Sequence, residues 1–555
     1  MTKDNKKLEV EKLNAEIERL KKELKERKKY GLVWEEKPEE VVEMCKKKLP
    51  VLKEVKNREI ITDKDKPVNL LIEGDNYHAL SVLNYTHAKK IDVIYIDPPY
   101  NTGNKDFIFN DRYIDREDSY RHSKWLSFME KRLKLAKNLL KDTGVIFISI
   151  DDNEMAQLKM LCDNVFGENN FIASFIRKSG VSPRHDAKYI SVQHDYILCY
   201  ARNSKTTKIN MLFVGEDPSY IFVDDYLIER GKFKLNKLDR GTKHYSESLV
   251  YPIQTPDGSI IYPGDGREGW IWTWSKEKLK WGIKNDFIVF KKINNKWHVY
   301  MKQYQFVDNS GNKLRRQIPY NSLILNFPNE QSIKDLNNIF PHKRFFDYPK
   351  PLNLMKYIMK ISTGRNSIIL DFFAGTGTTG HAVLELNKED GGNRQFILCT
   401  NNENNICTDV CYPRVKKVIE GYKNLRREWV EGLGGNLKYF KTDFINYDEP
   451  TDKNKIKLTQ QATEMLCVRE GTFEKVIDNE RFKIFKNSDH YTGIIWDQVA
   501  IPDFKKVIKD IKGKFSVYVF SLGDETFDDE FKDVKQKVQL SPIPEAILRV
   551  YRRIF

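Results

Sequence analysis

Hydrophobic residues follow two patterns that alternate along the middle of the chain. Short, mostly apolar runs are typical of strands buried on both faces, and they occur at residues 69–73, 91–96, 145–150, 367–370 and 395–399. Apolar positions at helical spacing predict helices between these runs, at residues 78–83, 125–140, 154–166, 352–361, 381–386 and 413–427. Strands that alternate with helices predict an α/β fold with a doubly wound, mostly parallel sheet, which the alternating segment 191–200 extends with an antiparallel edge.

This alternation stops between residues 202 and 336. Three features predict an inserted β-rich domain there: turn signals such as Pro256-Asp-Gly258, the alternating Trp270, Trp272 and Trp274, and basic residues that include Lys291, Lys292 and Lys302. We expect the tryptophans to pack in the core of this domain. The chain then divides into five parts, with boundaries at 1–68, 69–201, 202–336, 337–435 and 436–555.

An amphipathic segment precedes the first strand. The apolar residues Val10, Leu13, Ile17, Leu20 and Leu24 recur at spacings of three and four, which predicts a helix of two heptads. Because so short a helix is marginal as an isolated coiled coil, packing against the chain's own body is favoured over pairing with a second copy.

Charge and cysteine content narrow the class of protein. Lysine and arginine number 94 against 79 aspartates and glutamates, and this net charge of +15 fits either a partner rich in negative charge or a solubilising surface. No apolar run is long enough to span a membrane and the first residues are highly charged, so we expect a cytoplasmic protein. Of the seven scattered cysteines only Cys407 and Cys411 are close in sequence, and without a second pair they predict no metal site.

Two strand ends carry the candidate chemistry. The run at 91–96 ends in Asp97-Pro98-Pro99-Tyr100, where the prolines remove backbone donors and stiffen the turn, so that its carbonyls point outward. Such a turn can grip a flat group between a carboxylate and an aromatic ring.

The second strand end is glycine-rich. Residues Asp371 to Gly380 read Asp-Phe-Phe-Ala-Gly-Thr-Gly-Thr-Thr-Gly and lead into a helix, which predicts close approach of a ligand at a helix N-terminus. The spacing departs from the dinucleotide fingerprint, and the chain has no G-x-x-x-x-G-K-[ST] loop, so an unaided ATPase is not predicted. Ligands of open α/β sheets bind at the carboxyl ends of the strands, so both turns can face one crevice.

The pair of motifs in this order resembles the β class of S-adenosylmethionine-dependent DNA amino-methyltransferases, and more specifically the Mod subunits of type III restriction-modification systems. The resemblance covers most of residues 30–430, and it includes Asn69 to Leu80, Asp97 to Gly103, Gly144 to Asp152, 191–200, Pro349 to Leu352 and Phe396 to Glu403. It implies the methyltransferase fold in permuted order. The parts would be an N-terminal dimer or partner contact, a catalytic half, a target-recognition domain, a cofactor-binding half and a C-terminal docking or DNA-contacting domain.

The chemistry explains why the first turn carries these residue types. The exocyclic amine of adenine is a poor nucleophile, so Asp97 and the Pro98 carbonyl would accept its hydrogens and stabilise the charge that develops on nitrogen. Tyr100, at the end of the turn that Pro99 stiffens, would stack on a base flipped out of the duplex.

The resemblance also implies a set of cofactor contacts. Around the methionine and sulfonium of S-adenosylmethionine it places Asp371, Phe373, Ala374, Gly375 and Gly377, and near the adenine it places Asp75. The acid that bonds the ribose in many relatives is displaced here, so Glu403 is the candidate. Lys350 and Asn353 would close the pocket for the methionine carboxylate.

Several readings of substrate and partner stay open. A tetrad that begins with aspartate favours adenine N6 by resemblance, while cytosine N4, RNA or a protein amide would use the same chemistry. A non-enzyme alternative is a DNA-recognition scaffold for a restriction subunit. The basic insert favours double-stranded DNA, because base readout needs an element that fills a groove. The family implies a homodimer and a separate ATP-dependent restriction (Res) subunit, and no membrane partner is expected.

Overall fold

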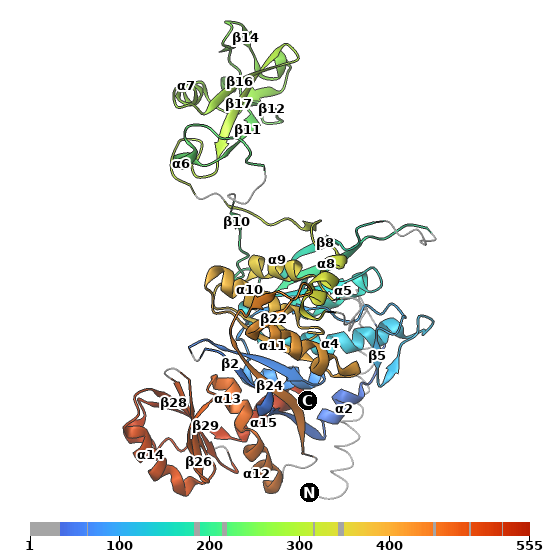
Figure 1. Cartoon of the computed structure of the whole chain (residues 1–555), viewed down its shortest axis with the longest axis vertical. Helices are drawn as coiled ribbons and strands as arrows, with labels where there is room; N and C mark the ends of the chain where they lie inside the picture. The colour runs from blue at the N-terminus through green and yellow to red at the C-terminus, as the bar shows by residue number, and fades with distance from the viewer. Residues whose placement is uncertain are drawn as a thin grey trace, which may run out of the picture. The chain divides into compact units, whose positions relative to one another are not determined.

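A mixed sheet organises the larger part of the chain (Figure 1). The structure is a computed structural model that describes residues 34–63, 65–182, 189–213, 219–314, 317–341, 349–447, 451–487, 490–523 and 525–555. The helix predicted over residues 10–24 lies outside these ranges. The chain divides into two compact units, one made of residues 1–208 and 322–555 and one made of residues 209–321.

In the described residues this sheet has eleven strands. Its order is β1 (Lys48–Glu54), β24 (Asn436–Asn446), β3 (Val68–Glu73), β21 (Gln395–Thr400), β20 (Ile368–Asp371), β4 (Ile91–Ile96), β7 (Leu140–Ile150), β9 (His194–Ala201), β8 (Phe171–Lys178) and β19 (Leu323–Ile324), and β2 (Ile60–Ile61) also pairs with β24. Neighbours from β24 to β7 are parallel, whereas β9 is antiparallel to both β7 and β8. The predicted doubly wound, mostly parallel sheet is confirmed, although β9 lies inside the sheet and not at its edge.

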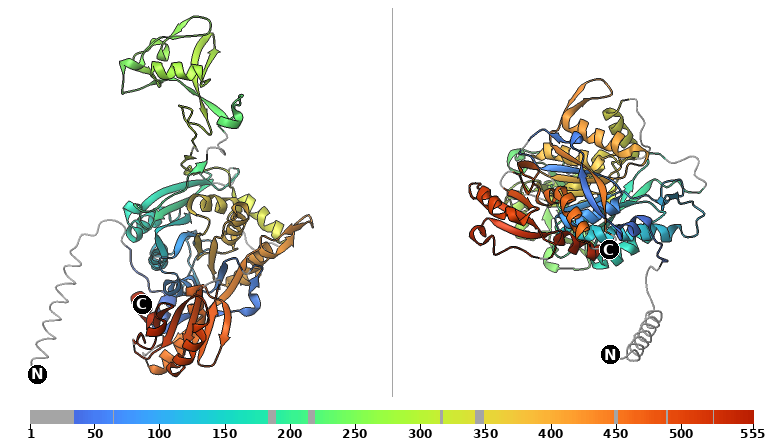
Figure 2. Two further views of the ribbon diagram at one scale, coloured as in Figure 1. Left: turned by 90° about the vertical axis from the view of Figure 1, so that its left-hand side faces the viewer. Right: turned by 90° about the horizontal axis from the view of Figure 1, so that it is seen from below.

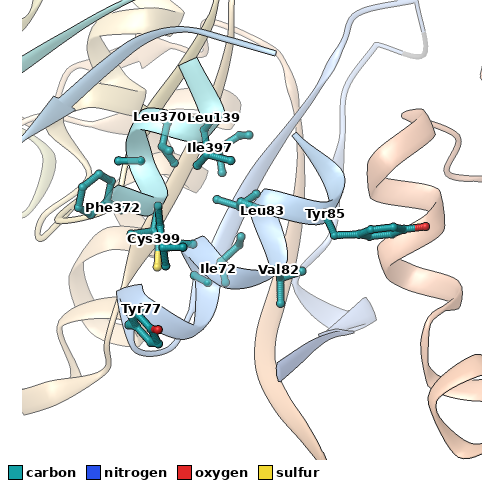
Figure 3. Packing of buried hydrophobic residues seen from close by; sticks show 14 of the residues in the cluster. Ile72, Tyr77, Val82, Leu83, Tyr85, Leu139, Leu370, Phe372, Ile397 and Cys399 are labelled. Carbon is teal, nitrogen blue, oxygen red and sulfur yellow. The ribbon is translucent and has the colours of Figure 1, made fainter. Parts of the chain in front are cut away.

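Helices cover the sheet in two groups (Figures 1 and 2). One group is α3 (Asn76–Thr86), α4 (Arg121–Leu139) and α5 (Met155–Phe166), and the other is α9 (Leu352–Ser362), α10 (Thr378–Asp390) and α11 (Tyr412–Glu420). Figure 3 shows how Ile72, Leu370 and Ile397 of three strands pack with Leu83 of α3 and Leu139 of α4. These apolar runs are buried, as predicted from their pattern.

One predicted helix is too long. The helix expected over 413–427 ends at Glu420, because Gly421 takes a positive φ of 101° and turns the chain into the hairpin of β22 (Gly421–Lys423) and β23 (Trp429–Glu431).

The strand order creates a switch point between β20 and β4. Helix α10 carries the chain from β20 to β21 on one side, and α4 carries it from β4 to β7 on the other side. Crossovers that leave two neighbouring strands in opposite directions open a crevice at their carboxyl ends. Asp371 is the last residue of β20 and Asp97 follows β4 directly, so both candidate turns lie at this crevice.

The insert is smaller than predicted. Its compact unit is 209–321, not 202–336, because β19 and α8 (Asn329–Ile339) belong to the larger unit, where β19 pairs with β8. It contains β10 (Leu212–Phe213), α6 (Leu227–Arg230), β11 (Phe233–Lys237), β12 (Asp239–Gly241), β13 (Ile253–Gln254), β14 (Ile260–Ile261), β15 (Trp270–Trp272), α7 (Lys276–Lys284), β16 (Ile288–Ile293), β17 (Lys296–Tyr304) and β18 (Gln317–Ile318).

Two predictions about side chains of the insert have different outcomes. Trp272 and Trp274 are buried in the apolar core of this unit, as expected, and Trp270 is half-buried. Lys302 is not an exposed cation, since it is 6% exposed and its Nζ lies 2.8 Å from an Asp224 oxygen and 2.6 Å from an Asp286 oxygen. Its charge is therefore neutralised within the unit.

The regions at both ends of the chain join the main sheet. The predicted boundaries at 68 and 436 are wrong in this respect, because β1 precedes the first and β24 follows the second, and the two strands pair with each other. The N-terminal region also holds α2 (Glu40–Cys45). The C-terminal region adds α12 (Asp452–Gln461), α13 (Thr463–Glu470), α14 (Ile501–Lys509), α15 (Glu545–Ile554) and a sheet of β25 (Glu474–Asp478), β26 (Phe482–Lys486), β27 (His490–Ile495), β28 (Lys514–Phe520) and β29 (Val538–Ile543).

This C-terminal region packs on the first strands and helix of the larger unit. Helices α13 and α15 contact α3, and the hydroxyl of Tyr551 donates to the carbonyl of Pro50 at 2.5 Å. Across the part of the chain that the structure describes, no helix has the length and apolar character needed to cross a membrane.

Candidate functional site

The acidic turn and the glycine turn leave adjacent strands. Ile369 pairs with Val93 and Leu370 with Ile94 in parallel register. Both strands end shortly after this pairing, and the charge of Asp97 acts on Asp371. The two motifs, separated by more than 270 positions in the sequence, therefore meet at one place.

The carboxylate of Asp97 forms a three-membered polar cluster. Lys350 Nζ lies 2.7 Å from Asp97 Oδ1 and 2.8 Å from Oδ2, and it also lies 2.9 Å from the Tyr100 hydroxyl oxygen. The Tyr100 hydroxyl donates to Asp97 Oδ1 at 2.9 Å. Burial, with Asp97 adding to it, raises the pKa of Tyr100 well above its usual range, so this hydroxyl stays a donor.

Burial and a hydrogen bond from helix α4 hold the two prolines of the turn in place. Pro98 is buried, and the carbonyl of Pro99 accepts a hydrogen bond of 2.8 Å from Nε1 of Trp125, a fully buried residue of α4. The Pro99 carbonyl already accepts this hydrogen bond. The backbone acceptor that the sequence analysis assigns to the reaction is the carbonyl of Pro98. The turn is rigid before any ligand arrives.

The glycine turn is closed around a buried acid. Asp371 is 3% exposed, and its carboxylate accepts from the amide of Phe373 at 3.0 Å and from the hydroxyl of Thr379 at 2.5 Å. Burial raises the pKa of Asp371 to about 7, and the charge of Asp97 acts in the same direction. A group of this kind can change its protonation when a cation binds beside it.

Two glycines give this turn its shape. Gly375 has a φ of 49° and Gly377 a φ of 77°, both in the left-handed region that other residues enter at a cost. The amide of Ala374 donates to the carbonyl of Cys399 at 3.1 Å, which ties the turn to the end of β21. A Cβ built on Gly375 meets only its own turn, at 3.9 Å from the Phe373 carbonyl oxygen, so the space in front of this residue is open.

These residues fit a cationic cofactor with a methionine-like part. The crevice combines an open glycine turn, the N-terminus of α10 and two carboxyl groups, Asp371 and Asp97. Carboxyl groups complement a sulfonium and an ammonium, while the helix N-terminus complements a carboxylate.

Asp75 caps a helix of this site. Its Oδ1 accepts from the amide of Tyr77 at 2.7 Å at the start of α3, and Oδ2 lies 3.5 Å from the buried Arg132. Arg132 also bonds Asn76, whose amide nitrogen lies 3.3 Å from the carbonyl oxygen of Phe372. Asp75 is thus linked to the glycine turn, in agreement with its predicted neighbourhood, and its contact with adenine stays a prediction.

Glu403 lies at the exposed margin of the site. It follows β21, and its Oε1 accepts a hydrogen bond of 3.1 Å from the hydroxyl of Tyr113. Tyr113 belongs to the hairpin of β5 (Ile108–Phe109) and β6 (Arg112–Tyr113), which follows the acidic turn. Its role at the ribose stays a prediction. Asn353 is exposed on α9.

Several residues of the site were not anticipated from sequence. Besides Trp125 and Arg132, they are Asn101 with Glu154, and the buried pair of Arg177 with Asp195, whose charge acts on Tyr100. Lys350 was anticipated at the methionine carboxylate, whereas here it contacts Asp97. The sequence does carry a signal for a restricted Lys350, because Pro349 and Pro351 flank it. A residue before proline is held extended, which limits where its side chain can reach.

The sheet order, the acidic turn and the glycine turn together define an α/β fold with two candidate motifs at one switch point. A family model described as DNA methylase matches residues 91–410, more than half of the chain. The chain belongs to this DNA methylase family.

Three relatives are similar to the chain. The StyLTI Mod subunit of a type III restriction-modification enzyme from Salmonella typhimurium is 34% identical over 368 residues, covering 60% of this chain and 52% of the relative. The EcoPI Mod subunit of a type III restriction-modification enzyme from Escherichia phage P1 is 32% identical over 378 residues, covering 60% and 58%. The type II methyltransferase M.KpnI from Klebsiella pneumoniae is 33% identical over 390 residues, covering 67% and 90%. The chain spans little more than half the length of the two Mod subunits.

Proposed function

We propose that this chain transfers a methyl group from S-adenosylmethionine to the N6 amine of adenine in double-stranded DNA, as the modification and recognition subunit of a type III restriction-modification system. The observation that carries the proposal is the meeting of Asp97 and Asp371 at the switch point between β4 and β20. The likeness to two Mod subunits and to a type II methyltransferase supports it.

The acidic turn supplies what an aromatic amine needs in order to react. The nitrogen lone pair of such an amine is delocalised into the ring. The carboxylate of Asp97 and the Pro98 carbonyl would accept the two hydrogens of the amine and favour a pyramidal nitrogen. Positive charge then grows beside a carboxylate that is already in place, which lowers the barrier without a covalent intermediate on the enzyme. Lys350 contacts both oxygens of Asp97 and would share this carboxylate with the amine.

Tyr100 is the stacking group for a flipped adenine. Its hydroxyl is held by Asp97, so the ring has a fixed orientation at the mouth of the turn. An enzyme that acts on a base amine must take the base out of the stack and replace the lost stacking energy, and an aromatic face does this.

Bound S-adenosylmethionine supplies an electrophilic methyl group. For its methionine part the chain offers the turn of Asp371, Phe373, Ala374, Gly375 and Gly377, and for its adenosine part it offers Asp75 and Glu403. The open space at Gly375 and the raised pKa of Asp371 are the observations that fit this group.

A methyl-transfer assay tests the proposal. The full chain is incubated with S-adenosylmethionine labelled in the methyl group and with duplexes that contain adenine, cytosine or both as candidate targets. We expect label on adenine N6, and a loss of about 10²–10³-fold in rate for Asp97→Ala with the cofactor still bound. Label on cytosine N4 would select the alternative substrate. Cofactor binding without any transfer to DNA would contradict an enzyme and favour a recognition scaffold.

The partners belong to the same proposal. The compact unit of residues 209–321 would read the target sequence, a second copy of the chain would complete a homodimer, and a separate ATP-dependent Res subunit would perform cleavage. Residues 451–555 would then dock a partner or contact DNA, and the site of action would be the cytoplasm. Sequencing of methylated positions in a host that expresses the chain identifies the target, and the molar mass in solution tests the dimer.

A further inference from the structure

A buried amide and a buried carboxyl group meet directly behind the acidic turn. Asn101 follows Tyr100 and has a φ of 58°, while Glu154 lies in the turn after β7, at the start of α5. Both residues are 0% exposed. Asn101 Nδ2 donates to Glu154 Oε1 at 2.5 Å. The residue that leaves the catalytic turn thus has a left-handed conformation, and its side chain bonds the neighbouring strand end.

One oxygen of each group has no partner among the described residues. Asn101 Oδ1 and Glu154 Oε2 are both buried acceptors without a hydrogen bond. A buried oxygen left without a donor costs free energy, and two such oxygens on groups that already touch form an unusual arrangement. A single proton placed between them would satisfy both.

The surroundings give Glu154 no cationic hydrogen-bond partner. Its Oε1 lies 2.6 Å from Nδ1 of His122, on α4. Arg121 donates from Nε to Nε2 of His122 at 3.2 Å, which favours the ring proton on Nδ1, directed at Glu154. The longer contact of 3.3 Å between Gln157 Nε2 and the same Nδ1 is then not a hydrogen bond. Burial, with Arg121 adding to it, lowers the pKa of His122, and this imidazole is neutral.

Two further charges act on Glu154 from a distance. Arg121 favours the ionised carboxylate, and Asp151, in the same turn as Glu154, disfavours it. The hydrogen bond from Asn101 Nδ2 also favours the ionised form, but burial is stronger than these contributions and raises the pKa of Glu154 to about 8. The electrostatic balance therefore agrees with the geometry of the unpaired oxygens.

We propose that Glu154 is a neutral carboxylic acid whose Oε2–H donates to Asn101 Oδ1, closing a two-bond acid–amide pair that positions the exit of the catalytic turn. Asn101 Nδ2–H to Glu154 Oε1 is the first bond of this pair, and the proposed bond runs in the opposite direction between the remaining atoms. Glu154 is a positioning residue, since it acts on Asp97 and Tyr100 through Asn101 and touches neither.

Ionisation would undo this pair. Without its proton, Glu154 Oε2 faces Asn101 Oδ1 as one acceptor against another, and the left-handed conformation of Asn101 loses half of its support. The acidic turn then relaxes, and methyl transfer falls as the pH rises through the pKa of Glu154. This consequence for activity rests on the proposed function, whereas the protonation state does not.

Infrared spectroscopy tests the protonation state without any reaction. In the full chain at about pH 7 we expect a carbonyl band of a buried, protonated carboxylic acid that disappears in Glu154→Gln and that titrates away as the pH rises above about 8. Glu168→Gln, which changes an exposed glutamate shortly after α5, should leave the band unchanged. A spectrum in which Glu154→Gln removes only a carboxylate band at pH 7 would overturn the proposal.

The pH profile of methyl transfer tests the positioning role. In the wild type and in Glu168→Gln the rate should fall by up to about tenfold per pH unit above about pH 8. Glu154→Gln keeps a donor for Asn101 Oδ1 and should stay within about threefold of the wild type at pH 7, with no alkaline decline. Glu154→Ala should lose more than about tenfold at every pH. An unchanged alkaline decline in Glu154→Gln would overturn the role.

The two measurements separate this inference from the proposed function. A wild type that shows the infrared band but no methyl transfer to any DNA contradicts the proposed function and leaves Glu154 a neutral acid. A wild type that methylates DNA but has an ionised Glu154 at pH 7 contradicts the inference and leaves the function intact.

Discussion

Lys350 Nζ bridges both carboxylate oxygens of Asp97, at 2.7 Å from Oδ1 and 2.8 Å from Oδ2. The pair joins the residue after β4 to the residue before the first turn of α9, across 253 positions of sequence. Because Oδ1 accepts from Lys350 and Tyr100 and Oδ2 accepts from Lys350, an amine at Asp97 has to share the carboxylate with the ammonium group. Lys350 therefore holds the carboxylate in place in the free chain and competes with the amine for it.

Replacing Lys350 with methionine separates two roles for this residue. If Lys350 acts on Asp97, as its contacts indicate, Lys350→Met should change the rate of methyl transfer by about 10–100-fold, because it removes a charge-assisted hydrogen bond. The Kd for S-adenosylmethionine should then change by less than about threefold. If it holds the methionine carboxylate, the Kd should rise by the larger factor. Calorimetry and single-turnover rates measure both quantities. Lys360→Met, at an exposed position of α9, serves as the control. A Kd for S-adenosylmethionine that rises in Lys350→Met and not in Lys360→Met would contradict a role of Lys350 at Asp97.

Asp371 predicts a pH dependence of cofactor binding. Its folded pKa of about 7 means that the free chain carries a protonated Asp371 in mildly acidic solution. A sulfonium and an ammonium favour the carboxylate, so binding must release this proton below about pH 7, and affinity rises with pH until the group is ionised. We expect the Kd to fall by up to about tenfold per pH unit between about pH 5.5 and 7 and to level off above it.

Calorimetry in buffers of different ionisation enthalpy checks this expectation directly. The wild type should release close to one proton on binding at about pH 6 and almost none at about pH 8. Asp371→Asn should bind more weakly with no pH dependence. A Kd of the wild type that stays constant over this range would show that Asp371 does not respond to the cofactor.

The sequence predicts the strands around these residues well because their burial leaves a direct pattern. Continuous apolar runs at 91–96 and 395–399 correspond to β4 (Ile91–Ile96) and β21 (Gln395–Thr400). Strand β8 was missed, since its residues alternate only weakly between buried and exposed, and β24 was placed in a separate domain because a chain alone does not say which sheet a strand joins.

The site was predictable where it depends on backbone and not where it depends on distant side chains. Asp97 and Asp371 could be assigned to one crevice because parallel strands share a carboxyl edge. The contacts of Lys350 with Asp97, and of Glu154 with Asn101, join segments whose separation in sequence carries no information on side-chain direction. They required the packed structure.

Gly377 predicts a strict requirement for glycine in the cofactor turn. Its φ is 77°, and a Cβ at this position would lie 3.0 Å from Cys411 Sγ and 3.5 Å from the carbonyl oxygen of Cys411. Gly377→Ala should therefore cost the left-handed strain of about 1–2 kcal/mol plus the displacement of Cys411, which directly precedes α11, and should weaken cofactor binding by more than about tenfold.

Gly391 offers a matched control at the other end of α10. It has a φ of 67°, and a Cβ there meets nothing within 4 Å. Gly391→Ala should cost only the backbone strain, about 1–2 kcal/mol in urea unfolding, with an unchanged Kd for the cofactor. Equal effects of the two substitutions on the Kd would mean that the crowding at Gly377 is irrelevant to binding.

Arg177 and Asp195 form a buried ion pair that fixes where the chain returns from the insert. Arg177, on β8, bonds the carboxylate of Asp195 on β9, the carbonyl of Phe327 at 3.0 Å and the side chain of Asn329 at 2.9 Å. Phe327 and Asn329 follow β19, the strand by which residues after 321 rejoin the main sheet. Asp195 also acts electrostatically on Tyr100. The guanidinium of Arg177 thus bonds both the segment that follows the insert and the carboxylate that acts on Tyr100.

Removing one member of this pair should be far more damaging than removing both. Arg177→Met leaves a carboxylate buried without its partner and is expected to cost about 3–5 kcal/mol of unfolding free energy, whereas the double variant Arg177→Met with Asp195→Asn should recover at least half of that loss. Lys532→Met, in an exposed pair with Asp529, should cost less than about 1 kcal/mol. Urea unfolding of the wild type, Arg177→Met, Asp195→Asn and the double variant measures the coupling, with Lys532→Met as the control. Additive losses in the double variant would mean that Arg177 stabilises the fold through Phe327 and Asn329, and that its charge pairing with Asp195 contributes little.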